Sequence, residues 1–224
     1  MTSAPRTEPF VIHHVRYDDW FERHRAAYLS ELLAVRALLP WEGQGLEIGV
    51  GTGRFAGPLG VKFGIDPAGE MLGYARARGV SVAGAVAEGL PFLDAVFHYA
   101  LVVTTICFVD DARAMLREIA RVLRPGGKVV IGLIDRESPL GQDYVTHQAE
   151  NVFYREATFY SAAEVEALLK ETGFSHLVWV QTLSMPLSQI HEIEPTSAGT
   201  DRGAFLVVRA QAPSKIGVRR EECC

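Results

Sequence analysis

Short apolar runs alternate with longer amphipathic stretches through the middle of the chain, and this alternation limits the possible folds. The runs lie at Leu46–Ile48, Val61–Ile65, Val80–Ala83, Phe97–Thr104 and Lys128–Ile134. Apolar residues recur at helical spacing in Gly69–Arg78 and in Ala112–Leu123, which follows a candidate N-cap at Asp110 or Asp111. Strands that alternate with helices predict βαβ units and a mostly parallel sheet, which is an α/β fold.

The C-terminal third adds one helix and two strands to the prediction. The segment Ser161–Thr172 opens with a capping box and ends before Gly173. Two further strands are predicted at Leu177–Leu183 and Ala204–Ala210. They are expected to pair antiparallel at one edge because no clear helix separates them. The other long connections, at residues 135–160 and 184–203, are expected to be loops.

The length and the two end segments predict one main domain with two appendages. A chain of 224 residues suits a single hydrophobic core. Residues 1–40 are expected to form a loose arm and then a helical cap, whose helix spans 17–39 and ends at Pro40. Residues 41–212 are expected to form the main domain, and 213–224 a flexible tail.

Charge and composition exclude several classes of function. The formal net charge is −5, which argues against nucleic acid as a partner. No apolar run is long enough to span a bilayer, and Met1–Pro9 lacks a signal core, so a cytoplasmic location without membrane association is expected. Cys107 is expected to be a small buried residue, while Cys223 and Cys224 lie in the tail. The histidines show no metal-ligand spacing, so no metal site is predicted.

The most specific local pattern follows the first apolar run, where glycine stands at positions 49, 51 and 53. Glycine adopts positive φ and lets a ligand approach the backbone. The dinucleotide fingerprint G-x-G-x-x-G fails because its sixth position, counted from Gly49, is Arg54. Glu47 would repel a pyrophosphate but suits a positive group, such as an α-amino group or a sulfonium. The alternative is a tight strand-to-helix turn without a ligand.

The second apolar run leads into Asp66, seventeen residues after Gly49. A carboxylate at this place can accept two hydrogen bonds from a ribose diol. Nicotinamide and S-adenosylmethionine enzymes share the feature, so Asp66 indicates a nucleoside without deciding which one. The alternative is an exposed turn, since Asp66-Pro67 is common turn chemistry.

Four motifs in order carry a resemblance to a known family. They are Leu46–Phe55, Gly64–Leu72, Ala87–Phe92 (Ala-Glu-Gly-Leu-Pro-Phe) and Arg121–Gly127 (Arg-Val-Leu-Arg-Pro-Gly-Gly). On these motifs the chain resembles the class I S-adenosylmethionine-dependent methyltransferases, in particular the small-molecule group with a ubiquinone/menaquinone-biosynthesis-type domain. The resemblance implies a Rossmann-like, doubly wound sheet of seven strands in the order 3-2-1-4-5-7-6, with the last strand antiparallel. It makes residues 41–212 an S-adenosylmethionine-binding domain.

The resemblance also implies S-adenosylmethionine as cofactor and S-adenosylhomocysteine as product. The implied cofactor-binding residues are Tyr17, Glu47, Gly49, Gly51, Gly53, Asp66, Pro67, Met71, Ala87, Glu88, Thr104 and Thr105. In this set the glycines would approach the methionine part, Glu47 its amino group, and Asp66 the ribose. Met71, Ala87 and Glu88 would flank the adenine. Tyr17 would cap the site, and its alternative role is core packing. Thr104 and Thr105 would face the methionine part, and their alternative role is ordinary β-branched filling of the strand.

Two positions depart from the family pattern. Val86 stands where the family often has an aspartate that reaches the adenine amino group, and His98 stands at another frequent aspartate position. Backbone atoms near Ala87, or Glu88 itself, would then bind the adenine.

The expected activity is transfer of a methyl group to a small-molecule acceptor, an amine or a hydroxyl, by in-line displacement. A general base is needed only if the nucleophile arrives protonated, so no obligatory catalytic residue is implied. Candidates are Asp135, at the end of the fifth strand, and Tyr144 and Tyr154, whose aromatic-rich segment would line an acceptor pocket or pack into the core. The alternatives are a non-catalytic S-adenosylmethionine-binding protein, a nicotinamide-dependent oxidoreductase and a nucleic-acid methyltransferase. The acceptor and the oligomeric state are left open.

Overall fold

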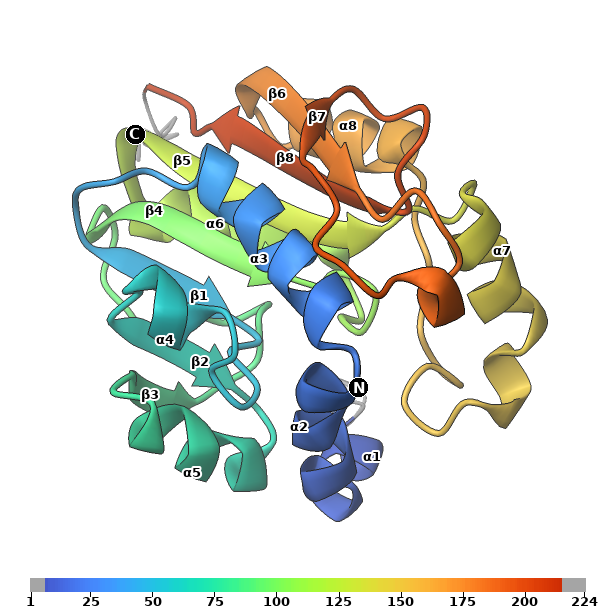
Figure 1. Ribbon diagram of the computed structural model, residues 1–224. Coiled ribbons are helices and arrows are strands. Elements are labelled where there is room, and N and C mark those ends of the chain that lie inside the picture. Colours follow the sequence, from blue (N-terminus) through green and yellow to red (C-terminus); the bar gives the residue numbers. More distant parts are fainter. Residues whose placement is uncertain (1–6, 215–224) are drawn as a thin grey trace, which may run out of the picture.

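A mixed sheet runs through the centre of the computed structural model, which describes residues 7–214 (Figure 1). Its eight strands in the described part are β1 (Gly45–Ile48), β2 (Phe63–Asp66), β3 (Ser81–Gly84), β4 (Phe97–Val103), β5 (Leu123–Ile134), β6 (Ser175–Thr182), β7 (Ser197–Ala198) and β8 (Phe205–Gln211). Their spatial order is β3-β2-β1-β4-β5-β8-β6-β7. Strands β1 to β5 are parallel, and β8 runs antiparallel to both β5 and β6.

If the two-residue strand β7 is left out, β8 is the seventh strand along the chain. It lies between β5 and β6, so the sheet confirms the expected order 3-2-1-4-5-7-6. Two details differ. The segment 184–203, expected to be a loop, contributes the short strand β7 and the 3₁₀ turn η2 (Leu187–Gln189). Strand β5 begins at Leu123 rather than at Lys128, since an irregularity at the Pro-Gly-Gly turn lets the strand pair with β4 on both sides of it.

Helices cover both faces of the sheet. They are α1 (Glu8–Ile12), α2 (His14–Arg23), α3 (Arg25–Leu38), α4 (Ala56–Leu59), α5 (Gly69–Ala77), α6 (Ala112–Val122), α7 (Pro139–Thr146) and α8 (Ala162–Glu171), with a 3₁₀ turn η1 at Gln148–Glu150. Helices α3, α4 and α5 pack on one face and α6 and α8 on the other. Successive residues of β4 point to opposite faces of the sheet, so Leu101 packs into one core and Val102 into the other.

Three helices confirm their sequence signals. Asp111 caps α6 by accepting a hydrogen bond from the backbone of Ala114. Helix α8 has the full capping box, in which Ser161 and Glu164 each accept a hydrogen bond from the other's backbone. Helix α5 lies where its periodicity predicted it.

The helix expected over 17–39 is wrong as a single element, because the chain leaves helical geometry at His24. The His24 ring stacks on Trp20 at 4.8 Å, and neither proline nor glycine marks the break. The arm contains α1, and the expected loop 135–160 contains α7. Helix α7 has ordinary start signals, with Ser138 as N-cap and Pro139 as first residue, that the sequence analysis did not use.

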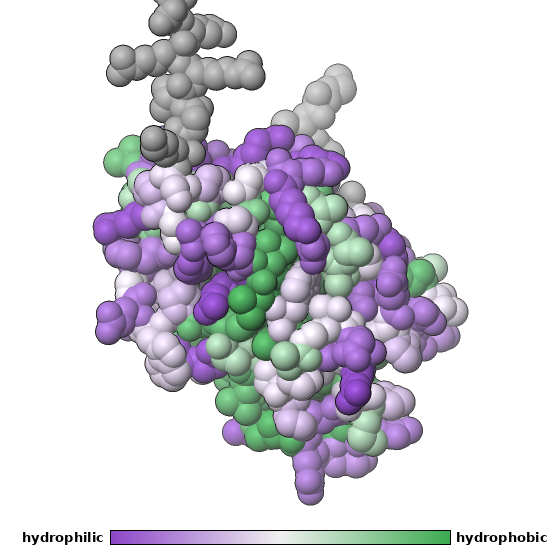
Figure 2. All heavy atoms as spheres, turned by 90° about the horizontal axis from the view of Figure 1, so that it is seen from above, coloured by the Kyte–Doolittle hydropathy of each residue, from purple (hydrophilic) through white to green (hydrophobic). Residues whose placement is uncertain are grey.

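The surface seen from above is mostly hydrophilic, with an apolar band across its middle (Figure 2). Within residues 7–214, no helix combines the length and the apolar character that a membrane crossing needs. Cys107 is buried, as expected. Cys223, Cys224 and most of the expected tail lie outside the described residues.

Candidate active site

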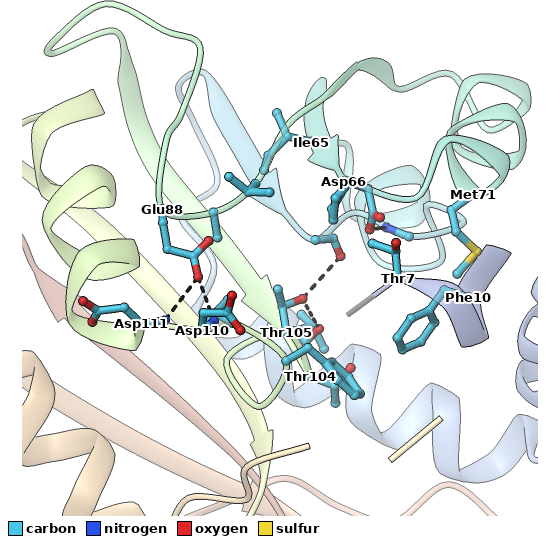
Figure 3. A pocket seen from close by; sticks show the side chains of 18 of the residues that line it. Thr7, Phe10, Ile65, Asp66, Met71, Glu88, Thr104, Thr105, Asp110 and Asp111 are labelled. Atoms are coloured by element: carbon cyan, nitrogen blue, oxygen red, sulfur yellow. Dashed lines mark hydrogen bonds between the residues drawn. The ribbon is translucent and has the colours of Figure 1, made fainter. Parts of the chain in front are cut away.

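A cavity of about 480 Å³ opens where strands β1, β2 and β4 end (Figure 3). Open α/β sheets bind ligands at this carboxyl edge, near the point where the strand order reverses. Of the implied binding residues, ten line the cavity: Tyr17, Gly49, Gly51, Asp66, Pro67, Met71, Ala87, Glu88, Thr104 and Thr105. Glu47 and Gly53 are not among the lining residues. Ten further residues line the wall without having been predicted as binding residues, and Phe10, Phe108, Asp110 and Asp111 are among them.

The glycine loop has the backbone that only glycine adopts readily. Gly49, Gly51 and Gly53 have φ angles of +69°, +50° and +80°. A Cβ atom on Gly49 would lie 2.2 Å from Oγ1 of Thr105, and one on Gly53 would lie 2.9 Å from Cα of Ala75. The following helix, α4, has only four residues, so the loop itself rather than a helix N-terminus shapes this part of the cavity.

Glu47 ends buried behind the glycine loop, with 2 % of its surface exposed. Its Oε2 atom has no hydrogen-bond partner among residues 7–214. Burial raises the pKa of Glu47 well above its ordinary value, although a hydrogen bond from the backbone of Ala56 opposes the rise. A buried carboxyl oxygen without a partner is costly, and a cationic group in the cavity would relieve this cost. The methionine ammonium of S-adenosylmethionine is such a group, so the residues present fit the implied cofactor.

Asp66 serves both the loop and the cavity. Its Oδ2 accepts a hydrogen bond from the backbone of Gly51 at 2.9 Å, and its Oδ1 accepts one from Ala68 at 2.8 Å. Each carboxylate oxygen keeps a further lone-pair direction for a ligand hydroxyl. Burial raises the pKa of Asp66 despite these two hydrogen bonds. The side chain therefore fixes the glycine loop while it faces the space beside Met71 (Figure 3).

The opposite wall joins two loops through Glu88. Its Oε1 accepts hydrogen bonds from the backbone of Asp110 at 2.8 Å and of Asp111 at 3.3 Å (Figure 3). Val86 and Ala87 line the cavity beside it. The Glu88 carboxylate thus already has backbone partners, and its main visible effect is to hold the segment after β3 against the start of α6.

Thr104 and Thr105 lie just beyond β4 and line the cavity, so they are not residues of the strand itself. Thr104 has a φ of +47°, which is strained for a side chain branched at Cβ. The hydroxyl of Thr105 donates to the carbonyl of Val103 at 3.0 Å and lies 3.4 Å from that of Gly49. This sharp bend brings the end of β4 against the glycine loop.

Ion pairs that were not predicted from the sequence connect helix α2 to the glycine loop. Asp18, 9 % exposed, accepts hydrogen bonds from Arg54 at 2.9 and 2.6 Å and from Arg78 at 2.9 Å. Arg54 also pairs with Glu22, and Arg78 donates to the carbonyl of Thr52. The partners are 36 and 60 residues apart in sequence, so no local spacing indicates them.

Aromatic side chains form the wall near Thr104. Tyr17 of α2 contacts Phe10 of α1 edge to face at 5.6 Å, and Phe10 contacts Phe108 at 5.0 Å. Burial, together with the charges of Asp66 and Glu47, raises the pKa of Tyr17. Phe10 comes from the segment expected to be a loose arm, which explains why it was missed.

The three candidate catalytic residues lie away from the lining of the large cavity. Asp135 is 6 % exposed, and its Oδ1 accepts a hydrogen bond from the backbone of Glu137 at 3.3 Å. Tyr144 and Tyr154 contact each other at 5.1 Å and pack with Phe159, which is the core-packing alternative. Contact of any of the three with an acceptor stays a prediction. No cluster that could hold a metal ion occurs within residues 7–214.

The chain is similar in sequence and in fold to known proteins. Residues 46–131 match the family model described as a methyltransferase domain. A crystal structure from Thermotoga maritima, described as an S-adenosylmethionine-dependent methyltransferase and possible histamine N-methyltransferase, is 48 % identical in sequence. The match covers 93 % of this chain and 99 % of that chain, with a TM-score of 0.89.

Two curated relatives extend the comparison. An uncharacterized protein of Methanocaldococcus jannaschii is 40 % identical over 195 residues, which are 87 % of this chain and 94 % of that protein. An O-methyltransferase of Aspergillus sclerotiorum is 32 % identical over 142 residues, which are 58 % of this chain and 53 % of that protein.

Proposed function

Since the chain belongs to the class I S-adenosylmethionine-dependent methyltransferases, we propose that it transfers a methyl group to a small-molecule amine or hydroxyl. S-adenosylmethionine is the cofactor of this family, and S-adenosylhomocysteine is the product. The observation that carries the proposal is the buried, unpartnered Oε2 of Glu47 beside a glycine loop that faces Asp66. This arrangement favours a ligand with both an ammonium group and a ribose.

The proposed roles follow from the contacts. Glu47 binds the methionine ammonium, directly or through water, because a cation compensates its buried carboxylate. Asp66 accepts hydrogen bonds from the ribose hydroxyls on its free lone pairs. Gly49 and Gly51 bring the backbone against the ligand, and Met71 packs on the adenine. Pro67, Ala87 and Glu88 complete the nucleoside wall, Thr104 and Thr105 face the methionine part, and Gly53 supports the turn.

Catalysis would rest on positioning. The bound sulfonium supplies both the methyl group and a good leaving group, so the protein must align the acceptor atom opposite the sulfur. Thr104 and Tyr17 lie at the end of the cavity where the aromatic wall stands. That wall excludes water from the transfer path, which favours the intended acceptor over hydrolysis.

Two relatives support keeping both acceptor classes. The Thermotoga maritima protein is described as a possible N-methyltransferase and the Aspergillus sclerotiorum protein as an O-methyltransferase. A non-catalytic binding protein of the same fold remains the competing function, and detection of methyl transfer to any acceptor would exclude it.

Thermal unfolding tests the cofactor. S-adenosylmethionine and S-adenosylhomocysteine, each at about a hundred times its Kd, should stabilise the protein by about 2.7 kcal/mol. For a chain of this length that corresponds to a rise in Tm of roughly 5–11 °C. NAD at the same concentration should leave Tm unchanged, since Arg54 replaces the glycine that a pyrophosphate site needs. A response to NAD alone would contradict the proposal.

Substitution of Asp66 tests the ribose contact. Hydrogen bonds to a charged carboxylate contribute about 1.5–3 kcal/mol each, so Asp66→Ala should weaken S-adenosylhomocysteine binding at least about tenfold in calorimetric titration. Loss of the Gly51 and Ala68 contacts should also lower Tm. Asp66→Asn keeps one acceptor oxygen, so its Kd and Tm should lie between those of the wild type and of Asp66→Ala. Glu70→Ala, an exposed carboxylate in α5, is the control. An unchanged Kd in Asp66→Ala would place the ribose elsewhere.

A further inference from the structure

A second cavity, of about 350 Å³, lies beside the large cavity and shares two lining residues with it, Thr7 and Phe108. Both volumes fall within the range of roughly 300–1,000 Å³ that is typical of small-molecule sites. The residues proposed to bind S-adenosylmethionine all lie outside the lining of the second cavity. Because a methyl transfer brings two ligands together, a second site of this size next to the first matches the needs of the reaction.

Aromatic rings form the boundary between the two cavities. Phe10 lines the large cavity and contacts Phe153, which lines the second one, with 5.5 Å between the ring centroids. Phe108 lines both cavities, contacts Phe10 and donates its backbone N–H to the carbonyl of Thr105 at 2.9 Å. Figure 3 shows Thr7 and Phe10 on the side of the large cavity away from Glu88. The cavities therefore meet across side chains close to the end of β4.

Phe10 is the ring whose movement would join the two cavities. Helix α1 has five residues, none of them buried, and the chain leaves helical geometry after it at His13. Helix α2, in contrast, is held by the ion pairs of Asp18 with Arg54 and Arg78. A half-buried ring on a short helix with few buried contacts can turn without unfolding its neighbours. The boundary can thus open while the rest of the site keeps its shape.

The lining of the second cavity combines an apolar part with a charged part. Phe108, Val152 and Phe153 are half-buried, whereas Glu8 and Arg155 are exposed and lie toward solvent. Aromatic walls favour an aromatic ligand, which gains both hydrophobic burial and ring contacts. A carboxylate and a guanidinium at the mouth can pair with a cationic or an anionic substituent.

We propose that the second cavity binds the methyl acceptor, a small aromatic compound whose nucleophilic nitrogen or oxygen points toward Phe10 and whose charged substituent points toward Glu8 and Arg155. The inference rests on the methyltransferase function proposed above. In the transfer, a lone pair of the acceptor attacks the methyl carbon, and the carbon–sulfur bond breaks with its electron pair on sulfur. The proton of the acceptor passes to water, so the products are the methylated acceptor and S-adenosylhomocysteine.

The test is calorimetric titration of the full chain saturated with S-adenosylhomocysteine, which binds without turnover. The probes are tyramine and 4-hydroxybenzoate, each with a phenol hydroxyl at one end and a charged group at the other, and their ring-free counterparts n-butylamine and n-butyrate. We expect at least one aromatic probe to bind about tenfold or more tightly than its counterpart. Equal affinities within both pairs would overturn the inference, as would a Kd above about 1 mM for both aromatic probes.

Two filling variants locate the bound probe. Val152 and Ile12 line the second cavity and not the large one, so Val152→Trp and Ile12→Trp should each weaken the aromatic probe at least about tenfold. The Kd of S-adenosylhomocysteine should stay within about threefold. Leu93→Trp adds the same side chain at a position that is 81 % exposed and lines neither cavity, so it should change nothing.

The outcomes separate this inference from the proposed function. Two variants from different segments, α1 and the stretch after η1, keep the test valid if one of them fails to fold. Probe affinity that does not fall in a folded filling variant would place the probe outside the second cavity and overturn the inference. Failure of the wild type to bind S-adenosylhomocysteine would instead contradict the proposed function.

Discussion

Replacement of Gly49 by alanine should weaken S-adenosylmethionine binding at least about a hundredfold, because the loop can no longer keep its shape against the cavity. Two effects combine at this residue. Its φ of +69° is strained for alanine, and the added Cβ would lie 2.2 Å from Oγ1 of Thr105 and 2.8 Å from its Cβ. Either the glycine loop or the end of β4 must move, and both line the cavity. Calorimetric titration with S-adenosylhomocysteine measures the loss.

Two further variants isolate the cause. Gly60 has a similar φ of +75° but open space around its Cβ position, so Gly60→Ala should lower stability by about 1 kcal/mol and leave the Kd unchanged. The double variant Gly49→Ala/Thr105→Ala removes the contacting atoms and should recover part of the affinity. Full affinity in Gly49→Ala alone would mean that the ligand does not depend on this backbone.

Replacement of Asp18 by asparagine should give the largest loss of stability. The variant leaves the guanidinium groups of Arg54 and Arg78 without their shared carboxylate, and the Asp18 and Arg54 side chains are only 12 % and 13 % exposed. Breaking a largely buried ion pair costs about 3 kcal/mol, which for this chain length lowers Tm by roughly 6–12 °C. Cofactor affinity should fall as well, because α2 carries Tyr17. The exposed neighbour Asp19 provides the control in Asp19→Asn.

The pH dependence of this effect has a definite sign. Burial would raise the pKa of Asp18, but hydrogen bonds, chiefly from Arg54, outweigh it and hold the pKa at about 2, below the ordinary 3.8. The folded state therefore favours the ionised form, and the stabilisation is complete above pH 4 and is lost as the pH falls toward 2. The Tm difference between wild type and Asp18→Asn should shrink over that interval. A constant difference would assign the effect to packing rather than charge.

The features that were predicted correctly from the sequence depend on residues close to one another in the chain. The glycine loop, the capping box at Ser161 and the alternation of strands and helices are encoded within a few positions, and the structure confirms them. The strand order and the antiparallel last strand came from the family resemblance and were also right. The break at His24 was missed because no helix-breaking residue stands there.

Contacts distant in sequence escaped prediction. Asp18 and Arg54 each look like ordinary surface charges until folding brings α2 against the glycine loop. Glu31 occurs in an amphipathic helix, where a charged residue usually marks the solvent face, yet its side chain is only 5 % exposed. Tyr144 and Tyr154 were found by composition alone, and only the fold shows that they contact each other and Phe159.

The hydrogen bonds from Gly51 and Ala68 to Asp66 have a consequence for the rate at which the cofactor binds. Because the protein's own carboxylate holds the glycine loop, the loop reaches its working conformation during folding rather than on contact with the nucleoside. Association then needs no ordering of the backbone, and its conformational entropy cost is confined to the ligand and a few side chains. Such preorganisation makes the association rate constant depend on diffusion and orientation, so differences in affinity among nucleoside analogues should appear in their dissociation rates.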